Sequence, residues 1–244
     1  MNRKRFQAIA SLGFALILIV DAARQAQAQD RQMLYPSMAP VEQYLMTDRN
    51  AEIALARSAA PEAISRDATI LVLGRHGYET AVEGTNGFVC AVERGWMGPF
   101  TGEDAANFWN PKLRGPLCFN PPAARSVLPL TYRRTEMILA GKSKAQVIAA
   151  LKAAYEKKEL PSLEPGAMSY MMSKEQYLTD DGQHNWIAHV MIYTPLIDSA
   201  VWGADLPHSP VMLNPQFHGD PEPIDVFMLP TGRWSDGTRA PMPK

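Results

Sequence analysis

The sequence has only two cysteines in 244 residues and no apolar run long enough to cross a membrane. Its longest run of this kind, residues 8–20, falls well short of the roughly 20 apolar residues that a spanning helix needs. Positive charge is not in excess, since 24 Lys and Arg stand against 25 Asp and Glu without a basic stripe. Phosphate binding depends on clustered Lys and Arg, so this composition argues against a nucleic-acid partner.

The first residues are typical of an export signal. Basic residues at positions 3–5 precede the short apolar run, and Ala26-Gln27-Ala28 is the small-x-small pattern that signal peptidase cuts. We expect a signal peptide over residues 1–28 and a periplasmic or secreted mature protein without a membrane span. The alternative is an uncleaved anchor, because Asp21 and Arg24 are charged residues unusually close to the cut.

After the signal we expect a polar N-terminal tail, residues 29–40, and then a single domain, residues 41–244. Residues 41–60 have a helical pattern in two pieces. Asp48 is placed to cap the second piece, and Pro61 ends it.

Three strand patterns follow at residues 69–73, 78–83 and 88–93. The turn sequence EGTNG separates the second pattern from the third, which predicts a β-hairpin and therefore a small antiparallel meander. Glu83 and Glu93 are interpreted as solvated ends of this hairpin.

A helical hairpin is predicted in the middle of the chain, at residues 129–140 and 144–155. Gly141 fits the C′ position of the first helix, and Ser143 with Gln146 forms a capping box for the second. The later strand patterns lie at residues 168–173, 186–193, 211–217 and 224–229, with a short helix at residues 198–203. Strands on both sides of helices indicate an α+β domain, in which helices pack on one mainly antiparallel sheet.

The two cysteines flank most of an unusual segment. In residues 94–120, glycines, prolines and aromatic residues are spaced too irregularly for a helix or a strand. The aromatic content of this segment argues against disorder. We predict a long ordered loop there. Cys90 and Cys118 are expected to form a structural disulfide, because both lie in the exported part and an oxidising compartment favours the bond.

A metal site is the tempting interpretation of the histidines, with soft ligands from His184, His189 and nearby methionines. In a regular strand, however, residues five apart point to opposite faces, so these two histidines would not converge. A single histidine among apolar residues is more often a hydrogen-bonded core residue. We therefore expect no metal and no cofactor.

Catalytic motifs are equally scarce. The stretch Gly74-Arg75-His76-Gly77 resembles the RHG motif of histidine phosphatases, but its strand-turn-strand context does not fit that family, and a turn accounts for both glycines. The alternative to a binding protein is an enzyme of the hydrolase or phosphoryl-transfer type. Such an enzyme would use His76, His184 or His189, with Arg75, since these side chains suit proton or phosphoryl chemistry at neutral pH.

The combination of GTNGFVC, FWNPKLRGPLCFNP and a C-terminal GRWSDGT resembles a group of exported bacterial proteins to which no activity is attached. The likeness covers nearly all of the mature chain. It implies export and a shared fold, and it assigns no functional residue.

The absence of an assembled acid, base or nucleophile favours a non-catalytic domain that binds an unknown small molecule or protein. Loops that are held by a rigid scaffold often carry function. We therefore expect any binding site beside the aromatic-rich loop, with Trp96, Trp109 or Arg114 at its rim.

Overall fold

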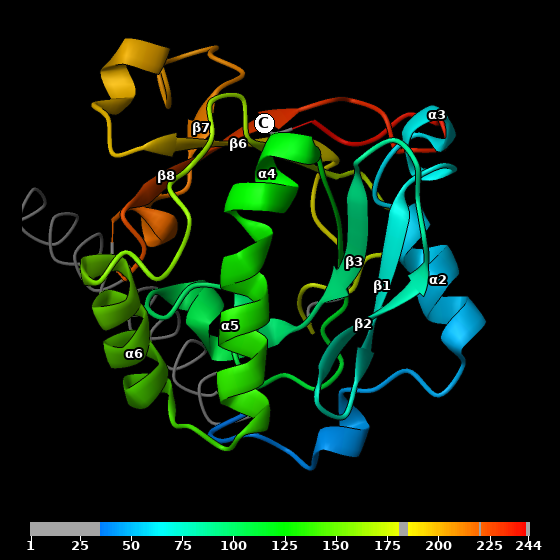
Figure 1. Ribbon diagram of the computed structural model, residues 1–244. Helices are drawn as coiled ribbons and strands as arrows, with labels where there is room; N and C mark the ends of the chain where they lie inside the picture. The colour runs from blue at the N-terminus through cyan, green and yellow to red at the C-terminus, as the bar shows by residue number, and fades with distance from the viewer. Residues whose placement is uncertain (1–34, 181–184, 220, 243–244) are drawn as a thin grey trace, which may run out of the picture.

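The computed structural model describes residues 35–180, 185–219 and 221–242, so the predicted signal peptide and most of the polar tail lie outside the described residues (Figure 1). One sheet of eight strands, in the order β2-β1-β3-β4-β5-β6-β8-β7, runs through the molecule. The strands are β1 Thr69–Gly74, β2 Gly77–Val82, β3 Val89–Glu93, β4 Gly115–Phe119, β5 Met168–Met171, β6 His189–Pro195, β7 Met212–Leu213 and β8 Ile224–Pro230. Only β1 and β3 pair in parallel, so the predicted α+β domain with a mainly antiparallel sheet is confirmed.

Helices and short 3-10 turns alternate with the strands. The helices are α2 Arg49–Arg57, α3 Glu62–Ser65, α4 Pro121–Ser126, α5 Leu128–Leu139 and α6 Lys144–Glu156, and the 3-10 turns are η1 Val41–Gln43, η2 Gly95–Met97, η3 Glu103–Asn107, η4 Ser199–Trp202 and η5 Pro215–Phe217. Within the described part of the chain, none of the helices combines the length and apolar character that crossing a bilayer requires.

Local capping signals place two of the helices. The Asp48 carboxylate accepts hydrogen bonds from the backbone N–H groups of Asn50 and Ala51 at the start of α2. Ser143 and Gln146 form the expected capping box of α6. The helices α5 and α6 thus occupy the two predicted segments, whereas their arrangement as a hairpin stays a prediction.

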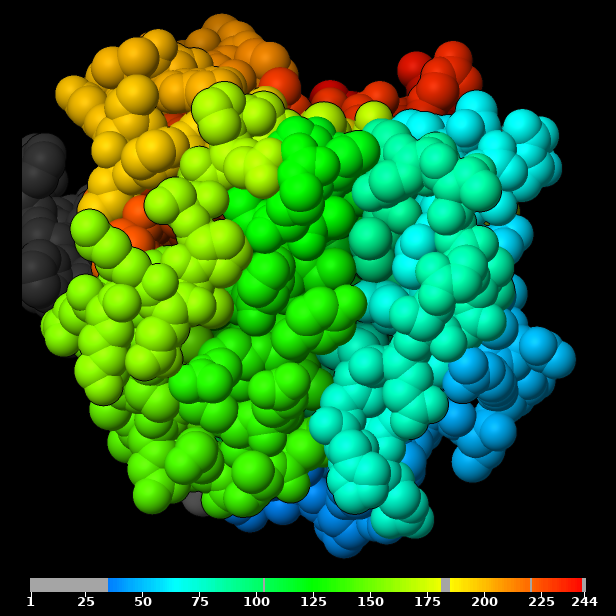
Figure 2. Space-filling model, viewed as in Figure 1, coloured from blue at the N-terminus to red at the C-terminus, as the bar shows by residue number. Residues whose placement is uncertain are grey.

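The two faces of the sheet are covered by different helices. Small and β-branched side chains of α2, β1 and β3 form a cluster on one face, together with the disulfide. The other face carries Leu71, Leu117 and Phe119, which pack against α4 and the start of α5. Figures 1 and 2 show α4 and α5 running down the middle of the view, with α6 beside α5, and in Figure 2 their side chains cover the middle of this face. The larger aromatic cluster lies between α5, α6 and the segment after β3.

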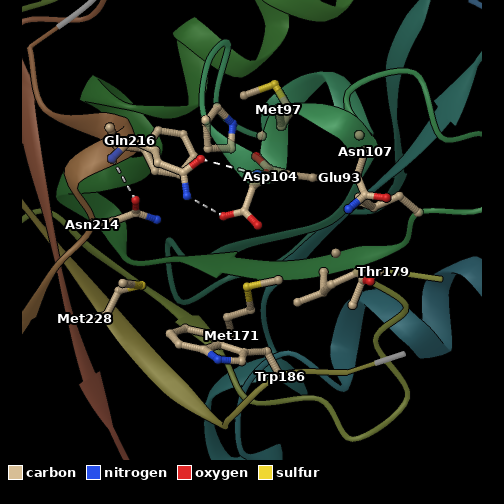
Figure 3. A pocket seen from close by; sticks show the side chains of 18 of the residues that line it. Glu93, Met97, Asp104, Asn107, Met171, Thr179, Trp186, Asn214, Gln216 and Met228 are labelled. Atoms are coloured by element: carbon tan, nitrogen blue, oxygen red, sulfur yellow. Dashed lines mark hydrogen bonds between the residues drawn. The ribbon is translucent and has the colours of Figure 1, made fainter. Parts of the chain in front are cut away.

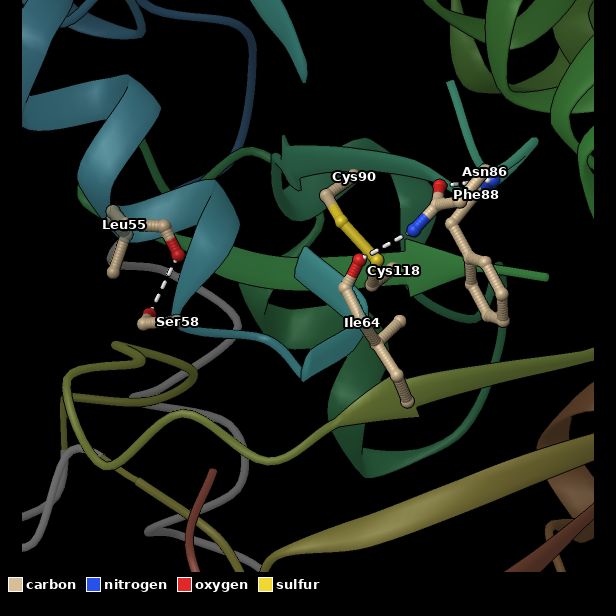
Figure 4. The surroundings of a disulfide bond; sticks show 7 residues. All are labelled: Leu55, Ser58, Ile64, Asn86, Phe88, Cys90 and Cys118. Carbon is tan, nitrogen blue, oxygen red and sulfur yellow. Dashed lines mark hydrogen bonds between the residues drawn. A yellow bond between two sulfur atoms is a disulfide. The ribbon is translucent and has the colours of Figure 1, made fainter. Parts of the chain in front are cut away.

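The predicted meander is wrong, because β3 does not pair with β2. It pairs in parallel with β1, so the chain after β2 passes around the start of β1 to its other side. A Cβ on Gly84 would lie 2.1 Å from the Thr69 nitrogen, and only glycine permits this close approach. Asn86 secures the crossing through a 2.8 Å hydrogen bond from Nδ2 to the Ile64 carbonyl (Figure 4).

The long loop predicted for residues 94–120 is only partly correct. Its last residues form β4, which pairs with β3 along five residues and joins the centre of the sheet. Cys90 and Cys118 stand directly opposite each other in this ladder, and the predicted disulfide is present (Figure 4). The disulfide therefore links two strands that backbone hydrogen bonds already hold together. The predicted strand at residues 211–217 is reduced to β7, followed by η5.

Candidate functional site

A cavity of about 920 Å³ opens on the face of the sheet that carries Leu117. Strands β3, β4, β5, β6 and β8 supply its floor, and the segments around η2, η3 and η5 supply its opposite wall. Figure 3 shows Met97, Glu93 and Asp104 on one side of the cavity, facing Met171 and Trp186 on the other. The segment after β3, beside which any binding site is expected, supplies part of the wall of this cavity, and its role in binding stays a prediction.

The wall around η2 and η3 is anchored by aromatic side chains, those of Trp96, Phe100 and Phe108, that are buried in the core and do not line the cavity. Trp96 is fully buried and donates from Nε1 to the Thr135 hydroxyl at 3.1 Å. A Cβ on Gly95 would lie 2.2 Å from the Asn107 carbonyl, so the turns η2 and η3 approach as closely as a glycine allows. At the rim, Gln216 Nε2 donates to the Asp104 carboxylate at 2.8 Å and joins η3 to η5.

Methionines dominate the floor. Strand register places Met191 directly opposite Met228, and it places Met171 opposite His189. Alternation along the strands turns all four side chains toward the same face, and all four line the cavity. Methionine is flexible and polarisable, so this floor suits apolar ligands of varied shape. Trp186, which is 41 % exposed, stands against it at the cavity entrance.

Glu93, at the end of β3, is a half-buried carboxyl in the cavity lining. Burial raises the pKa of its carboxyl to about 7, and this effect outweighs the Thr131 hydrogen bond and the Arg134 charge, which both lower the pKa. The Thr131 hydroxyl donates to Oε1 at 3.2 Å. Glu93, Arg134 and Glu222 also line a second, narrow hollow. In it, Arg134 Nε lies 3.5 Å from Glu222 Oε1. A perturbed carboxyl in a cavity is a common mark of a functional site.

His189 is buried beneath Trp186, with 4.9 Å between the two ring centroids. Its Nδ1 lies 2.7 Å from the Ile187 carbonyl, a geometry in which the imidazole N–H donates. Burial lowers the pKa of His189 to about 4, so the ring is neutral at neutral pH.

The carboxylate of Asp180 holds the rim of the cavity together. Tyr35 and Tyr177 donate their hydroxyl groups to it, and Lys112 Nζ lies 3.2 Å from Oδ1. Burial acts to raise the pKa of Asp180, but the hydrogen bonds from Tyr177, Tyr35 and Lys112 together lower it below its usual value. Asp180 is therefore charged, and Lys112 balances that charge.

The three residues predicted for the rim lie outside the cavity lining. Trp96 is enclosed in the core, as described above. Trp109 is half-buried against Phe108, and its carbonyl accepts a hydrogen bond from the Tyr44 hydroxyl at 2.8 Å. Arg114 folds back on the Pro111 and Leu113 carbonyls, and burial together with the Arg94 charge lowers its pKa to about 10. Their role in binding stays a prediction.

The histidines proposed for catalysis are not gathered at one place. Arg75 and His76 form the exposed tip between β1 and β2, where Arg75 pairs with Glu42 at 2.5 Å. His189 lines the cavity, whereas His184 and its predicted strand face lie outside the described residues. Over residues 35–180, 185–219 and 221–242, no three His, Cys, Asp or Glu side chains are placed to hold a metal ion.

Sequence reasoning missed Glu93 and misinterpreted it as a solvated hairpin end. The signal that could have found it is alternation, since Glu93 follows Val89 and Ala91 on the same strand face. Trp186 had no comparable signal, because its position depends on how β6 meets the segment before it. The chain matches no family model, and no curated protein or solved structure shows significant similarity to it.

Proposed function

We propose that this chain is an exported binding protein that holds a small, mainly apolar molecule in the cavity between the sheet and the wall around η2, η3 and η5. The observation that carries the proposal is the cavity itself. Its volume of about 920 Å³ lies within the range of roughly 300–1,000 Å³ that is typical of small-molecule sites. An apolar floor with a few polar groups is the lining that such sites usually have.

Export is supported by the disulfide together with the N-terminal signal pattern. Disulfides form and persist outside the cytoplasm. N-terminal sequencing of the protein recovered from periplasm and medium tests this part of the proposal, and Gln29 is the expected first residue. An intact Met1 in the membrane fraction would favour the anchor instead.

Binding is testable with Nile red, a neutral dye whose emission shifts to the blue in apolar surroundings. We expect saturable binding of one dye per chain. Ala106 lines the cavity on η3, so Ala106→Trp should fill part of it and weaken binding at least tenfold. Ala105, the preceding residue, does not line the cavity, and Ala105→Trp serves as the matched control.

Equal dye binding by both variants would place the dye elsewhere and contradict the proposal. The alternative of an enzyme that uses His76, His184 or His189 stays a prediction. Of the two histidines among them that the structure describes, His189 lines the cavity and His76 does not, and the low pKa of His189 makes it a neutral group.

A further inference from the structure

We propose that the cavity selects an organic cation, in which a protonated or quaternary amine carried on an apolar body is directed at Glu93. This inference rests on the proposed binding function and adds the chemical class of the ligand. It is drawn from the charges that face the cavity, from the absence of an ion-pair partner for Glu93 among the described residues, and from the methionine and tryptophan side chains of the lining.

Acidic side chains outnumber cationic ones among the described residues that line the cavity. Glu93, Asp104 and Asp180 are among its lining residues, and only Asp180 has a cationic partner, Lys112, among the residues described. Among the described residues of the lining, Arg94 is the one Lys or Arg; it is fully buried and directs its guanidinium group away, to Glu52 and the backbone. A cation that enters the cavity therefore meets uncompensated negative charge.

Glu93 in particular lacks a counter-ion. The Thr131 hydroxyl is its one hydrogen-bond partner in the described structure. Arg134 is engaged elsewhere, because its Nη1 donates to the Met97 carbonyl at 2.9 Å and its Nη2 to the Gly98 carbonyl at 3.2 Å. A buried carboxylate without a partner is costly, and a bound cation would remove that cost.

Other groups near Glu93 do not offer a second cation. Arg134 approaches from α5 together with Glu222, which adds a further negative charge to the same region. Tyr78 of β2 and Tyr193 of β6 face Glu93 across the core, and burial raises the pKa of both hydroxyls, so they remain neutral. An anionic ligand would be repelled by this arrangement.

The surfaces opposite Glu93 suit the remainder of such a ligand. Trp186 presents an exposed indole, and the face of an indole attracts cations. The methionines Met171, Met191 and Met228 offer a polarisable apolar floor for a hydrocarbon body. Figure 3 shows Trp186 and Met171 on the side of the cavity that faces Glu93 and Asp104.

The experiment compares ligands of equal length by displacement of Nile red at pH 8. The series is octyltrimethylammonium, its neutral isostere with carbon in place of nitrogen, 1-octanol and octanoate. We expect the cation to bind at least tenfold more tightly than either neutral compound, and octanoate to bind most weakly. This comparison uses the unmodified protein, so it does not depend on a variant that folds.

Two variants locate the effect. Glu93→Gln should bring the affinity for octyltrimethylammonium down to the affinity that the same variant has for 1-octanol. Asp104→Asn, at the rim, should cost no more than about threefold, since charges near solvent are screened. In the unmodified protein, cation affinity should also fall as the pH drops from 8 to 6, because Glu93 becomes protonated and the quaternary amine keeps its charge.

The outcomes separate this inference from the proposed function. If Nile red does not bind at all, the binding function itself fails. If Nile red binds but the cation and its neutral isostere displace it equally, only the assignment of a cationic ligand is overturned. Octanoate as the tightest ligand would overturn it in the same way.

Discussion

Arg94 and Glu52 form an ion pair with almost no access to water. Arg94 Nη2 lies 2.8 Å from Glu52 Oε1, and the two side chains are 0 % and 2 % exposed. The same carboxylate oxygen accepts the Leu73 backbone N–H at 3.1 Å, while Arg94 Nε donates to the Tyr44 carbonyl at 2.8 Å. The pair thereby ties α2 to β1 and to the end of β3, directly beside the wall of the cavity.

Removal of one partner from this pair should be strongly destabilising. Glu52→Ala leaves the Arg94 charge buried without compensation, and we expect a loss of about 3–5 kcal/mol in the free energy of unfolding. Glu52→Leu combined with Arg94→Met should lose less than Glu52→Ala alone, because no charge remains buried. Urea denaturation measures both variants. Exposed Glu62, changed to Ala, is the control and should shift stability by less than about 0.5 kcal/mol.

The crossing of the chain at Gly84 should tolerate no side chain. Gly84→Ala places a Cβ against the backbone of Ala68 and Thr69, which cannot move without disrupting the start of β1. We expect a loss of about 3 kcal/mol or more. Gly141→Ala is the control, because Gly141 has a positive φ of 77° but open space around it, so only the backbone strain of a left-handed alanine remains, and it should cost about 1 kcal/mol. Equal losses would show that the crossing is less tightly packed than described.

The disulfide should stabilise the protein without being required for its fold. In the chain-entropy account, loss of a link that closes the loop between Cys90 and Cys118 costs about 3–4 kcal/mol. The double variant with alanine at both positions should therefore unfold at a lower urea concentration. Its circular dichroism spectrum should stay native, because the hydrogen bonds between β3 and β4 persist. Intact-mass measurement after alkylation of the unmodified protein should find no free thiol, and two alkylated cysteines would contradict the assignment.

Glu93 and His189 should give opposite slopes to the dependence of stability on pH. The folded protein raises the pKa of Glu93 from 4.5 to about 7, so it binds the proton more tightly than the unfolded chain does. Stability contributed by Glu93 is therefore lost as the pH rises through this window. The folded protein lowers the pKa of His189 from 6.5 to about 4, so the contribution of His189 is gained as the pH rises from about 4 to 6.5.

Single variants separate these two contributions. Between pH 4.5 and 6.5 they offset each other in the unmodified protein. Glu93→Gln should leave a profile that rises to pH 6.5 and then levels off, and the variant should be more stable than the parent at pH 8 by roughly 1–3 kcal/mol. His189→Gln should leave a profile that falls up to pH 7. Urea midpoints from pH 4 to 8 give both slopes, and parallel profiles for all three proteins would show that neither group titrates in this range.

Elements with local signals were predictable from the sequence. The caps at Asp48 and Ser143 depend on residues within one helical turn, and β1 is recognisable from its β-branched and apolar residues. The pairing of β3 was not predictable in the same way. The EGTNG turn residues favour a hairpin in which β3 pairs with β2. In the structure, β3 pairs with the start of β1 instead, and only the tertiary fold decides between these two pairings. The glycine and proline in β4 concealed a strand that its neighbours stabilise.

The side chains that line the candidate site were not predictable from the sequence. A long, aromatic segment between two cysteines pointed to the wall of the cavity, yet Trp96 faces the core. An aromatic side chain gives no sign in the sequence of which side of a loop it will occupy. Glu93 became part of the site because β3 pairs with β4 and because Thr131 and Arg134 approach it from α5, and this convergence has no local signature.

The strand order also bears on self-association. An open sheet leaves two edge strands, and a long apolar edge invites pairing with another molecule. Here one edge is β2, where Arg49 reaches across from α2 to the Thr80 carbonyl and Glu79 adds exposed charge. The other edge is β7, which is only two residues long. Charge on the β2 edge and the shortness of β7 are two features that oppose pairing with the strands of another molecule.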